Sequence, residues 1–99
     1  MASEQMLIAG EWINSEDGST SDVLNPATGE VIATTPKATI GDVERCVVAS
    51  RAALNSKDWA AMDPAQRGRI LQKMAAATYA NAKSLAAIES SNNGKTFRE

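Results

Sequence analysis

The sequence predicts an α/β chain in which two short β-hairpins are followed by about three helices. Its first third holds short β-rich runs around Gly- and Pro-containing turns. At Thr39 the spacing of apolar residues changes from two to about 3.6, the period of a helix. Helix start and stop signals then recur as far as Asn93-Gly94.

The first hairpin is expected at residues 7–13. The apolar pairs Leu7-Ile8 and Trp12-Ile13 flank Ala9-Gly10-Glu11, and Gly10 can adopt the positive φ that a tight turn needs. Residues 14–20 are rich in Ser, Asp, Asn and Gly, a composition typical of a loop.

A second hairpin is expected at residues 22–34. Two β-rich runs, 22–24 and 30–34, flank the turn sequence Asn25-Pro26-Ala27-Thr28-Gly29. Pro36 cannot donate a backbone hydrogen bond, so it should end the second strand or confine it to a sheet edge.

The first helix should begin after Thr39, an N-cap with Asp42 as its reciprocal partner three residues later. Its apolar residues share one face, with Cys46 and Ser50 beside them: Ile40, Val43, Val47 and Leu54. The polar segment 55–58 should end it.

The next helical pattern begins with Asp63 as N-cap, Pro64 as first helical residue and Gln66 as capping partner. An apolar stripe at spacings of three and four follows: Leu71, Met74, Thr78, Ala82 and Leu85. Because this pattern is long for one globular helix, we predict two consecutive helices with Asn81 as the second N-cap, ended by Gly94.

The chain is poor in bulky apolar side chains. Of its 99 residues 43% are hydrophobic, and 18 of these are Ala. The expected order of elements also leaves the hairpins with exposed edges and little cover. We therefore expect independent folding to be marginal, and the chain to be the front of a larger fold.

Composition excludes several classes of partner. Lys and Arg number 10 against 12 Asp and Glu, a net charge of −2 with no block of like charges. A nucleic-acid binder usually carries a basic patch, and a membrane-surface helix a basic face.

The N-terminus is acidic rather than a signal peptide, and no apolar run approaches the roughly 20 residues that span a bilayer. One cysteine rules out an internal disulfide, so we expect a cytoplasmic protein.

Residue types and spacing predict no active site. The sequence has no histidine, the commonest general base and metal ligand. Cys46 is the only candidate nucleophile, and a neighbouring base or cation would have to activate its thiol. The adjacent Arg45 points to another side of a helix and cannot do so. Cys46 is explained as well by the role of a small apolar residue on a packed helix face. Gly94-Lys95-Thr96 resembles the end of a P-loop, but Glu89 stands where that motif has its first Gly. No G-x-G-x-x-G sequence occurs.

Four segments, in this order, resemble the beginning of an NAD(P)-dependent aldehyde dehydrogenase: residues 8–13 (IAGEWI), 23–32 (VLNPATGEVI), 63–71 (DPAQRGRIL) and 93–95 (NGK). The most specific is Asn25-Pro26-x-Thr28-Gly29-Glu30. The resemblance runs from about Leu7 to the end of the chain.

This resemblance implies the architecture and the activity of a longer parent. Residues 1–99 would be the N-terminal portion of the Rossmann-like, dinucleotide-binding domain, without the catalytic and oligomerisation domains. The parent, expected to be a homo-oligomer, would oxidise an aldehyde to a carboxylic acid with NAD or NADP through a cysteine thiohemiacetal and thioester. The family places none of its catalytic or cofactor-binding residues in this segment, so the isolated chain is expected to be inactive.

The resemblance also implies a monovalent cation site. Many family members bind such an ion, K⁺ or Na⁺, through main-chain oxygens before the Asn-Pro turn and an acidic side chain before the Asn-Gly-Lys segment. By position these residues are Val23, Leu24 and Asn92. Asn92 departs from the usual Asp and brings an oxygen without a charge, so binding should be weakened or lost.

Two other interpretations stay open. The chain could be a truncated, non-catalytic helical module that binds a full-length dehydrogenase subunit. It could also be a small domain with only a structural role. Co-purification with a longer subunit would favour the first of these, and a cooperative melt of the isolated chain would favour the second.

Overall fold

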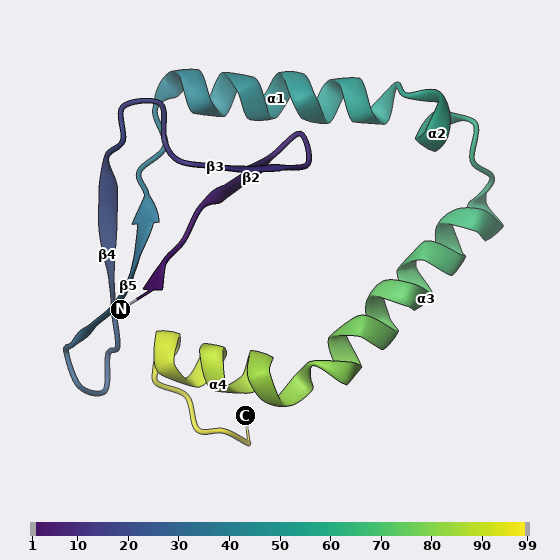
Figure 1. Cartoon of the computed structure of the whole chain (residues 1–99). Coiled ribbons are helices and arrows are strands. Elements are labelled where there is room, and N and C mark those ends of the chain that lie inside the picture. Colours follow the sequence, from purple (N-terminus) through teal and green to yellow (C-terminus); the bar gives the residue numbers. More distant parts are fainter. Residues whose placement is uncertain (1, 99) are drawn as a thin grey trace.

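The computed structural model describes residues 2–98. Within them five strands precede four helices, which confirms the predicted α/β order of strands first and helices after. Figure 1 shows the elements arranged along an open ring, with α1 (Ile40–Leu54) and α4 (Ala82–Asn93) on opposite sides.

The first hairpin is confirmed. Strands β2 (Met6–Ile8) and β3 (Glu11–Ile13) pair antiparallel, with Ile8 opposite Glu11. Ala9 and Gly10 between them have φ values of 53° and 79°. Two consecutive positive φ angles are the requirement of a type I′ turn, whose twist matches that of the flanking strands.

The second hairpin is confirmed and extended by a strand that the sequence did not reveal. Strands β4 (Thr20–Leu24) and β5 (Val31–Pro36) pair antiparallel, and β5 ends at Pro36 as predicted. Strand β1 (Ala2–Ser3) pairs parallel to β5, so that the sheet order is β1-β5-β4. Two residues are too short a segment for an alternating pattern, so only the long-range pairing defines β1.

Helix α1 begins as predicted. Thr39 Oγ1 accepts a hydrogen bond from the Asp42 backbone N–H at 3.1 Å, and Thr39 N–H donates to Asp42 Oδ2 at 2.9 Å, so that both halves of the capping box are present. Asn55 is the C-cap, as expected from the polar segment that follows.

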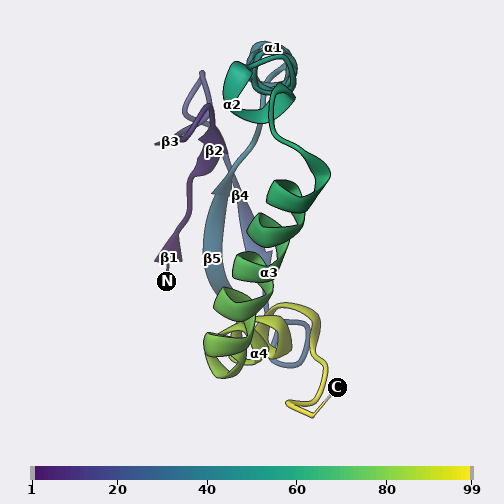
Figure 2. The same ribbon diagram turned by 90° about the vertical axis from the view of Figure 1, so that its right-hand side faces the viewer.

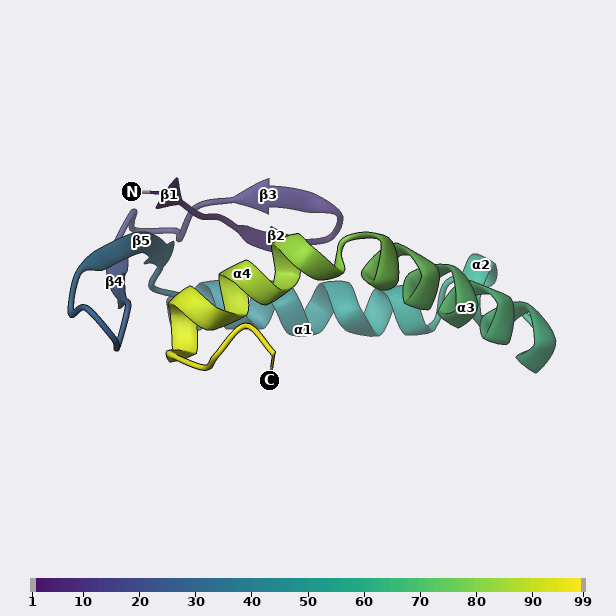
Figure 3. The same cartoon turned by 90° about the horizontal axis from the view of Figure 1, so that it is seen from below.

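The two sides of α1 differ in their contacts. The β2–β3 hairpin lies along the helix (Figures 1 and 3), and an open groove between them is lined by residues that include Ile8, Cys46, Ala49 and Ala53. The predicted apolar stripe lies elsewhere on the helix and is between 54% and 83% exposed: Ile40, Val43, Val47 and Leu54. Small residues therefore contact the hairpin, while the branched ones have little cover within residues 2–98.

A single-turn helix, α2 (Lys57–Ala60), occupies the segment predicted to be a stop. A residue of the next helix holds α2 in place: the Arg67 guanidinium lies 4.9 Å from the Trp59 ring centroid and donates to the Trp59 carbonyl at 3.0 Å. This contact joins α2 to α3 (Pro64–Ala80). Neither residue belongs to a local helix signal, which explains why α2 was missed.

The break between α3 and α4 falls at Asn81, which is the N-cap residue of α4 as predicted. Asn81 has φ −105° and ψ 16° and makes no side-chain capping bond. Its side-chain amide nitrogen instead donates to the Ala77 carbonyl at 2.8 Å, while its backbone carbonyl accepts from the Leu85 N–H at 3.0 Å, so Asn81 ends α3 with its side chain and begins α4 with its backbone. Helix α4 ends at Gly94, which has φ 77°, as predicted.

The described residues bury very little apolar surface. Ile8 is the one buried apolar side chain among residues 2–98. The chain exposes 7874 Å², against roughly 5,400 Å² for a compact chain of this size. Its radius of gyration is 17.1 Å rather than about 13 Å, and it forms a slab 48 × 37 × 15 Å in extent (Figure 2). The fold is therefore a surface layer without a hydrophobic core of its own.

Candidate functional site

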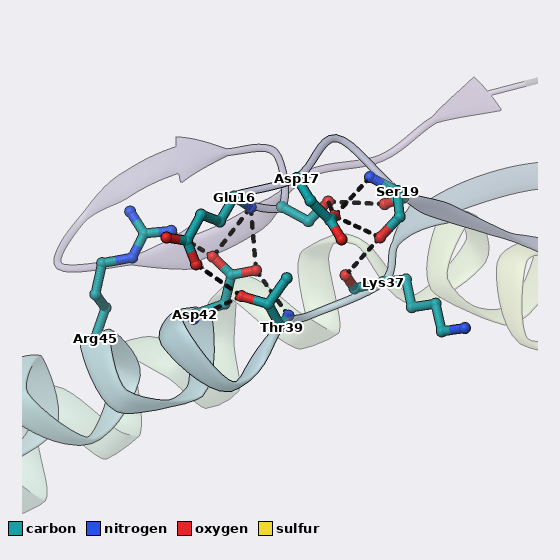
Figure 4. A network of polar contacts seen from close by, with 8 residues as sticks. Glu16, Asp17, Ser19, Lys37, Thr39, Asp42 and Arg45 are labelled. Atoms are coloured by element: carbon teal, nitrogen blue, oxygen red, sulfur yellow. Dashed lines mark hydrogen bonds and ion pairs between the residues drawn. The ribbon is translucent and has the colours of Figure 1, made fainter.

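The most buried polar contacts join the loop after the first hairpin to the start of α1. We call Glu16, Thr39, Asp42 and Arg45 the Asp42 clasp (Figure 4). The Asp42 side chain has no exposed surface, and its two oxygens accept hydrogen bonds from the Glu16 backbone N–H at 3.2 and 3.1 Å. The Arg45 guanidinium forms an ion pair with the same carboxylate. The capping box could be predicted from sequence, whereas no local signal indicated Glu16, which lies 26 residues away from Asp42.

The clasp contains a further bond through the Glu16 side chain. The Thr39 hydroxyl donates to Glu16 Oε2 at 2.9 Å. A Cβ atom on Gly41 would clash with the same oxygen, so the missing side chain at Gly41 leaves room for the Glu16 carboxylate. Both the backbone and the side chain of Glu16 are therefore held by the first turn of α1.

Asp17 continues the network along the loop. Its Oδ1 accepts from the Ser19 backbone N–H at 2.9 Å and from the Ser19 hydroxyl at 2.6 Å. These bonds from Ser19 lower the pKa of Asp17. The Lys37 carbonyl lies 3.2 Å from the same hydroxyl, which connects the loop to the segment after β5.

The pKa of Asp42 is lowered from 3.8 to about 2. The backbone N–H of Thr39 makes the largest contribution, burial opposes it, and the Glu16 N–H, Arg45 and the Thr39 side chain lower the pKa further. The carboxylate is thus ionised at neutral pH and surrounded by donors from this chain. Such an arrangement joins a loop to a helix and presents no free oxygen to a substrate.

Cys46 lies half-buried in the wall of the groove between α1 and the hairpin. Arg45, its neighbour in sequence, pairs with Asp42. Within residues 2–98 no hydrogen bond or ion pair joins the thiol to a cation or a base. Its position agrees with the interpretation of Cys46 as a small residue on a packed helix face.

The residues predicted to bind a cation lie on two segments that the structure brings together. Gly94, just after α4, lies against Pro26 in the turn after β4: a Cβ on Gly94 would be 3.1 Å from Pro26 Cγ. Val23 and Leu24 end β4, where the pairing with β5 is irregular, and Asn92 is exposed in the last turn of α4. No group of three or more His, Cys, Asp or Glu residues suited to a metal ion occurs in residues 2–98.

The segment that resembles the end of a P-loop forms a helix C-cap. The Lys95 backbone N–H donates to Asn93 Oδ1 at 2.8 Å, and the Ser90 hydroxyl donates to the Lys95 carbonyl at 2.6 Å. A phosphate-binding loop precedes a helix, whereas this segment follows one. The residues therefore end α4 and do not form a phosphate site.

Across residues 2–98 no helix combines the length and the apolar character that crossing a membrane requires.

Comparison with known proteins places these features in a family. The sequence profile of the Aldehyde dehydrogenase family matches residues 12–99. Phenylacetaldehyde dehydrogenase of Pseudomonas fluorescens is 41% identical over 91 residues, which are 92% of this chain and 18% of that protein. Retinal dehydrogenase 2 of Homo sapiens is 39% identical over 94 residues, which are 94% of this chain and 18% of that protein.

Solved structures agree with the sequence matches. The NAD-dependent aldehyde dehydrogenase of Sinorhizobium meliloti has a TM-score of 0.90 and 38% identity, over 96% of this chain and 19% of that one. A betaine aldehyde dehydrogenase of Staphylococcus aureus in complex with NAD⁺ has a TM-score of 0.91 and 33% identity over the same shares. The chain thus spans about a fifth of the length of the relatives it matches. It belongs to the aldehyde dehydrogenase family.

Proposed function

We propose that residues 1–99 form the N-terminal portion of the dinucleotide-binding domain of an aldehyde dehydrogenase that oxidises an aldehyde to a carboxylic acid with NAD or NADP. The observation that carries this proposal is the likeness to the Sinorhizobium meliloti enzyme, with a TM-score of 0.90 over 96% of the chain at 38% identity. A likeness at that level of identity supports a shared activity as well as a shared fold.

In this proposal the chain supplies a frame rather than reacting groups. The sequence has no Gly-rich turn of the dinucleotide-binding type, so residues 1–99 do not fit NAD or NADP by themselves. We assign cofactor binding, and the cysteine that forms the thiohemiacetal and thioester, to parts of the enzyme outside these residues. The Asp42 clasp would fix the hairpins to α1, and the exposed apolar residues would face the rest of the enzyme. We further propose a homo-oligomeric, cytoplasmic enzyme, which gel filtration and cell fractionation would test.

The proposal is tested by purifying the native protein with an antibody against residues 1–99 and supplying a panel of aldehydes with NAD or NADP. We expect aldehyde-dependent formation of the reduced cofactor by the antibody-bound protein. The purified 99-residue chain, assayed in parallel, should show no turnover. Turnover by that chain, or none by the native protein with any aldehyde, would contradict the proposal.

The exposed apolar surface also supports a second candidate function. A 99-residue module that binds a full-length dehydrogenase subunit would cover the same surface by association. In that case the antibody would recover a polypeptide of 99 residues together with a longer subunit, and not one long polypeptide. Denaturing electrophoresis of the recovered material separates the two functions.

We also propose that the turn after β4 and the end of α4 hold K⁺ or Na⁺ weakly, through the Val23 and Leu24 carbonyls and the Asn92 amide oxygen. The contact between Pro26 and Gly94 supports this placement, because it joins the two segments that carry the ligands. The donors fit a monovalent ion rather than Mg²⁺ or Zn²⁺, since all three are neutral oxygens.

Replacing Asn92 by Asp restores a charged ligand, and we expect it to tighten binding by about tenfold, since ligand charge sets cation affinity. Thermal unfolding of the native protein in KCl, NaCl and choline chloride measures the effect. The variant should gain more stability from K⁺ or Na⁺ than the parent does. Equal dependence on the three salts in both proteins would exclude the site.

A further inference from the structure

Gly68 lies inside α3, four residues after Pro64, where glycine is less favourable than alanine. A Cβ atom built on Gly68 meets no other atom within 4 Å. The described residues therefore leave room for a side chain at this position. Local stability alone would favour alanine here.

The other glycines have explanations within the chain. Of the six, Gly10, Gly18, Gly29 and Gly94 have positive φ values, between 72° and 79°. Gly41 leaves room for the Glu16 carboxylate. Gly68 alone has an ordinary helical backbone and no near neighbour, so nothing within residues 2–98 requires the missing side chain.

Gly68 begins a narrow seam along α3. Residues three and four apart share one side of a helix, and the seam that starts at Gly68 contains small or apolar side chains: Gly68, Leu71, Ala75 and Thr78. Leu71 is 64% exposed. Figure 1 shows α3 running along the ring apart from the strands and from α1. The seam is thus an apolar face with an accessible backbone at one end.

We propose that an apolar helix from the remaining part of the dehydrogenase packs on this seam and approaches the α3 backbone most closely at Gly68. This inference rests on the proposed function, because the helix would belong to the part of the enzyme that corresponds to the unmatched four fifths of the relatives. The chain exposes roughly 2,500 Å² more than a compact one would, while each partner in a standard interface buries about 800 Å². An excess of exposed surface of that size indicates a large, permanent partner and not a transient one.

The test is Gly68→Ala in the native protein. If the helix approaches at Gly68, the added methyl group must displace it, and Tm falls by about 2 °C or more. Helix propensity alone gives the opposite sign, because alanine is favoured wherever there is room. Gly41→Ala is the matched control: the flexible end of Glu16 can yield there, so its Tm should change less than that of Gly68→Ala.

An unchanged or raised Tm for Gly68→Ala overturns the inference. If the variant does not accumulate, hydroxyl-radical labelling of the unsubstituted protein gives a second readout. Leu71 should be labelled several-fold less in the native protein than in the denatured one. Equal labelling overturns the inference. A recovered polypeptide of only 99 residues that is dimeric and protects Leu71 would also overturn it, because the occupant would then be a second copy of this chain. Absence of dehydrogenase activity in the unsubstituted protein would refute the proposed function separately.

Discussion

Asp42 connects two parts of the chain that share few other buried contacts. Its carboxylate receives the backbone N–H groups of Thr39 and Glu16 and pairs with Arg45. Charge-assisted hydrogen bonds of this kind are stronger than neutral ones, and they favour the ionised form of the acid. The loop that follows the first hairpin is therefore held to α1 by an electrostatic contact rather than by apolar packing.

The depressed pKa of Asp42 makes the clasp sensitive to acid. Because the folded-state pKa, about 2, lies below the ordinary value of 3.8, the clasp stabilises the fold above about pH 4 and loses this effect as the pH falls toward 2. We expect Asp42→Asn to lower Tm at neutral pH and to flatten the fall of Tm in acid. Thermal unfolding of the native protein and the variant, from neutral pH to about pH 2, measures both effects.

Asp58→Asn provides the matched control, because Asp58 is exposed in α2 and takes no part in the clasp. It should leave the Tm-against-pH curve close to that of the parent. Parallel curves for the parent and Asp42→Asn would show that Asp42 does not fasten the loop to the helix.

At the scale of elements, the starts and ends of helices are fixed by local capping bonds. In α3 the Asp63 carboxylate accepts from the Gln66 N–H at 2.8 Å, and the Asp63 N–H donates to Gln66 Oε1 at 2.9 Å. Pro64 follows in the first helical position, where its missing N–H has no cost. These bonds matter because α3 has few contacts with other elements in residues 2–98.

Asp63→Ala removes the acceptor of this capping box. We expect a loss of about 1 kcal/mol in the free energy of unfolding, the usual effect of removing an N-cap side chain. Urea unfolding of the native protein measures the loss, and hydrogen exchange at residues 64–68 locates it. Asp58→Ala, which removes a carboxylate with no capping role, should change the free energy by less than half as much. Similar values for both variants would mean that the capping box does not stabilise α3.

Elements with local signals could be predicted from the sequence, and elements held by distant contacts could not. Gly10 and the 25–29 turn indicated the two hairpins, and Thr39, Asp63 and Gly94 indicated where helices begin or end. Strand β1 depends on pairing with β5, and α2 on the contact between Trp59 and Arg67. For the same reason only part of the Asp42 clasp could be predicted: its capping box is a local signal, whereas Glu16 lies 26 residues from Asp42.

At the scale of the whole molecule, the chain is a thin layer whose apolar residues remain uncovered. Apolar side chains along α1, α3 and α4 are exposed, among them Val47, Met74 and Ile88, at 57%, 59% and 62%. Burial of apolar surface is the main force in folding, at roughly 25 cal/mol per Å². A layer without a core therefore requires a second surface. Under the proposed function, the rest of a dehydrogenase would supply that surface.

The most direct test of this proposal is the intact mass of the native polypeptide that carries residues 1–99, measured after antibody capture and denaturation. We expect a polypeptide about five times as long, because this chain corresponds to 18% or 19% of its relatives. A mass equal to that of 99 residues, for a monomer that melts cooperatively without a partner, would contradict the proposal that these apolar faces are covered by the rest of a dehydrogenase.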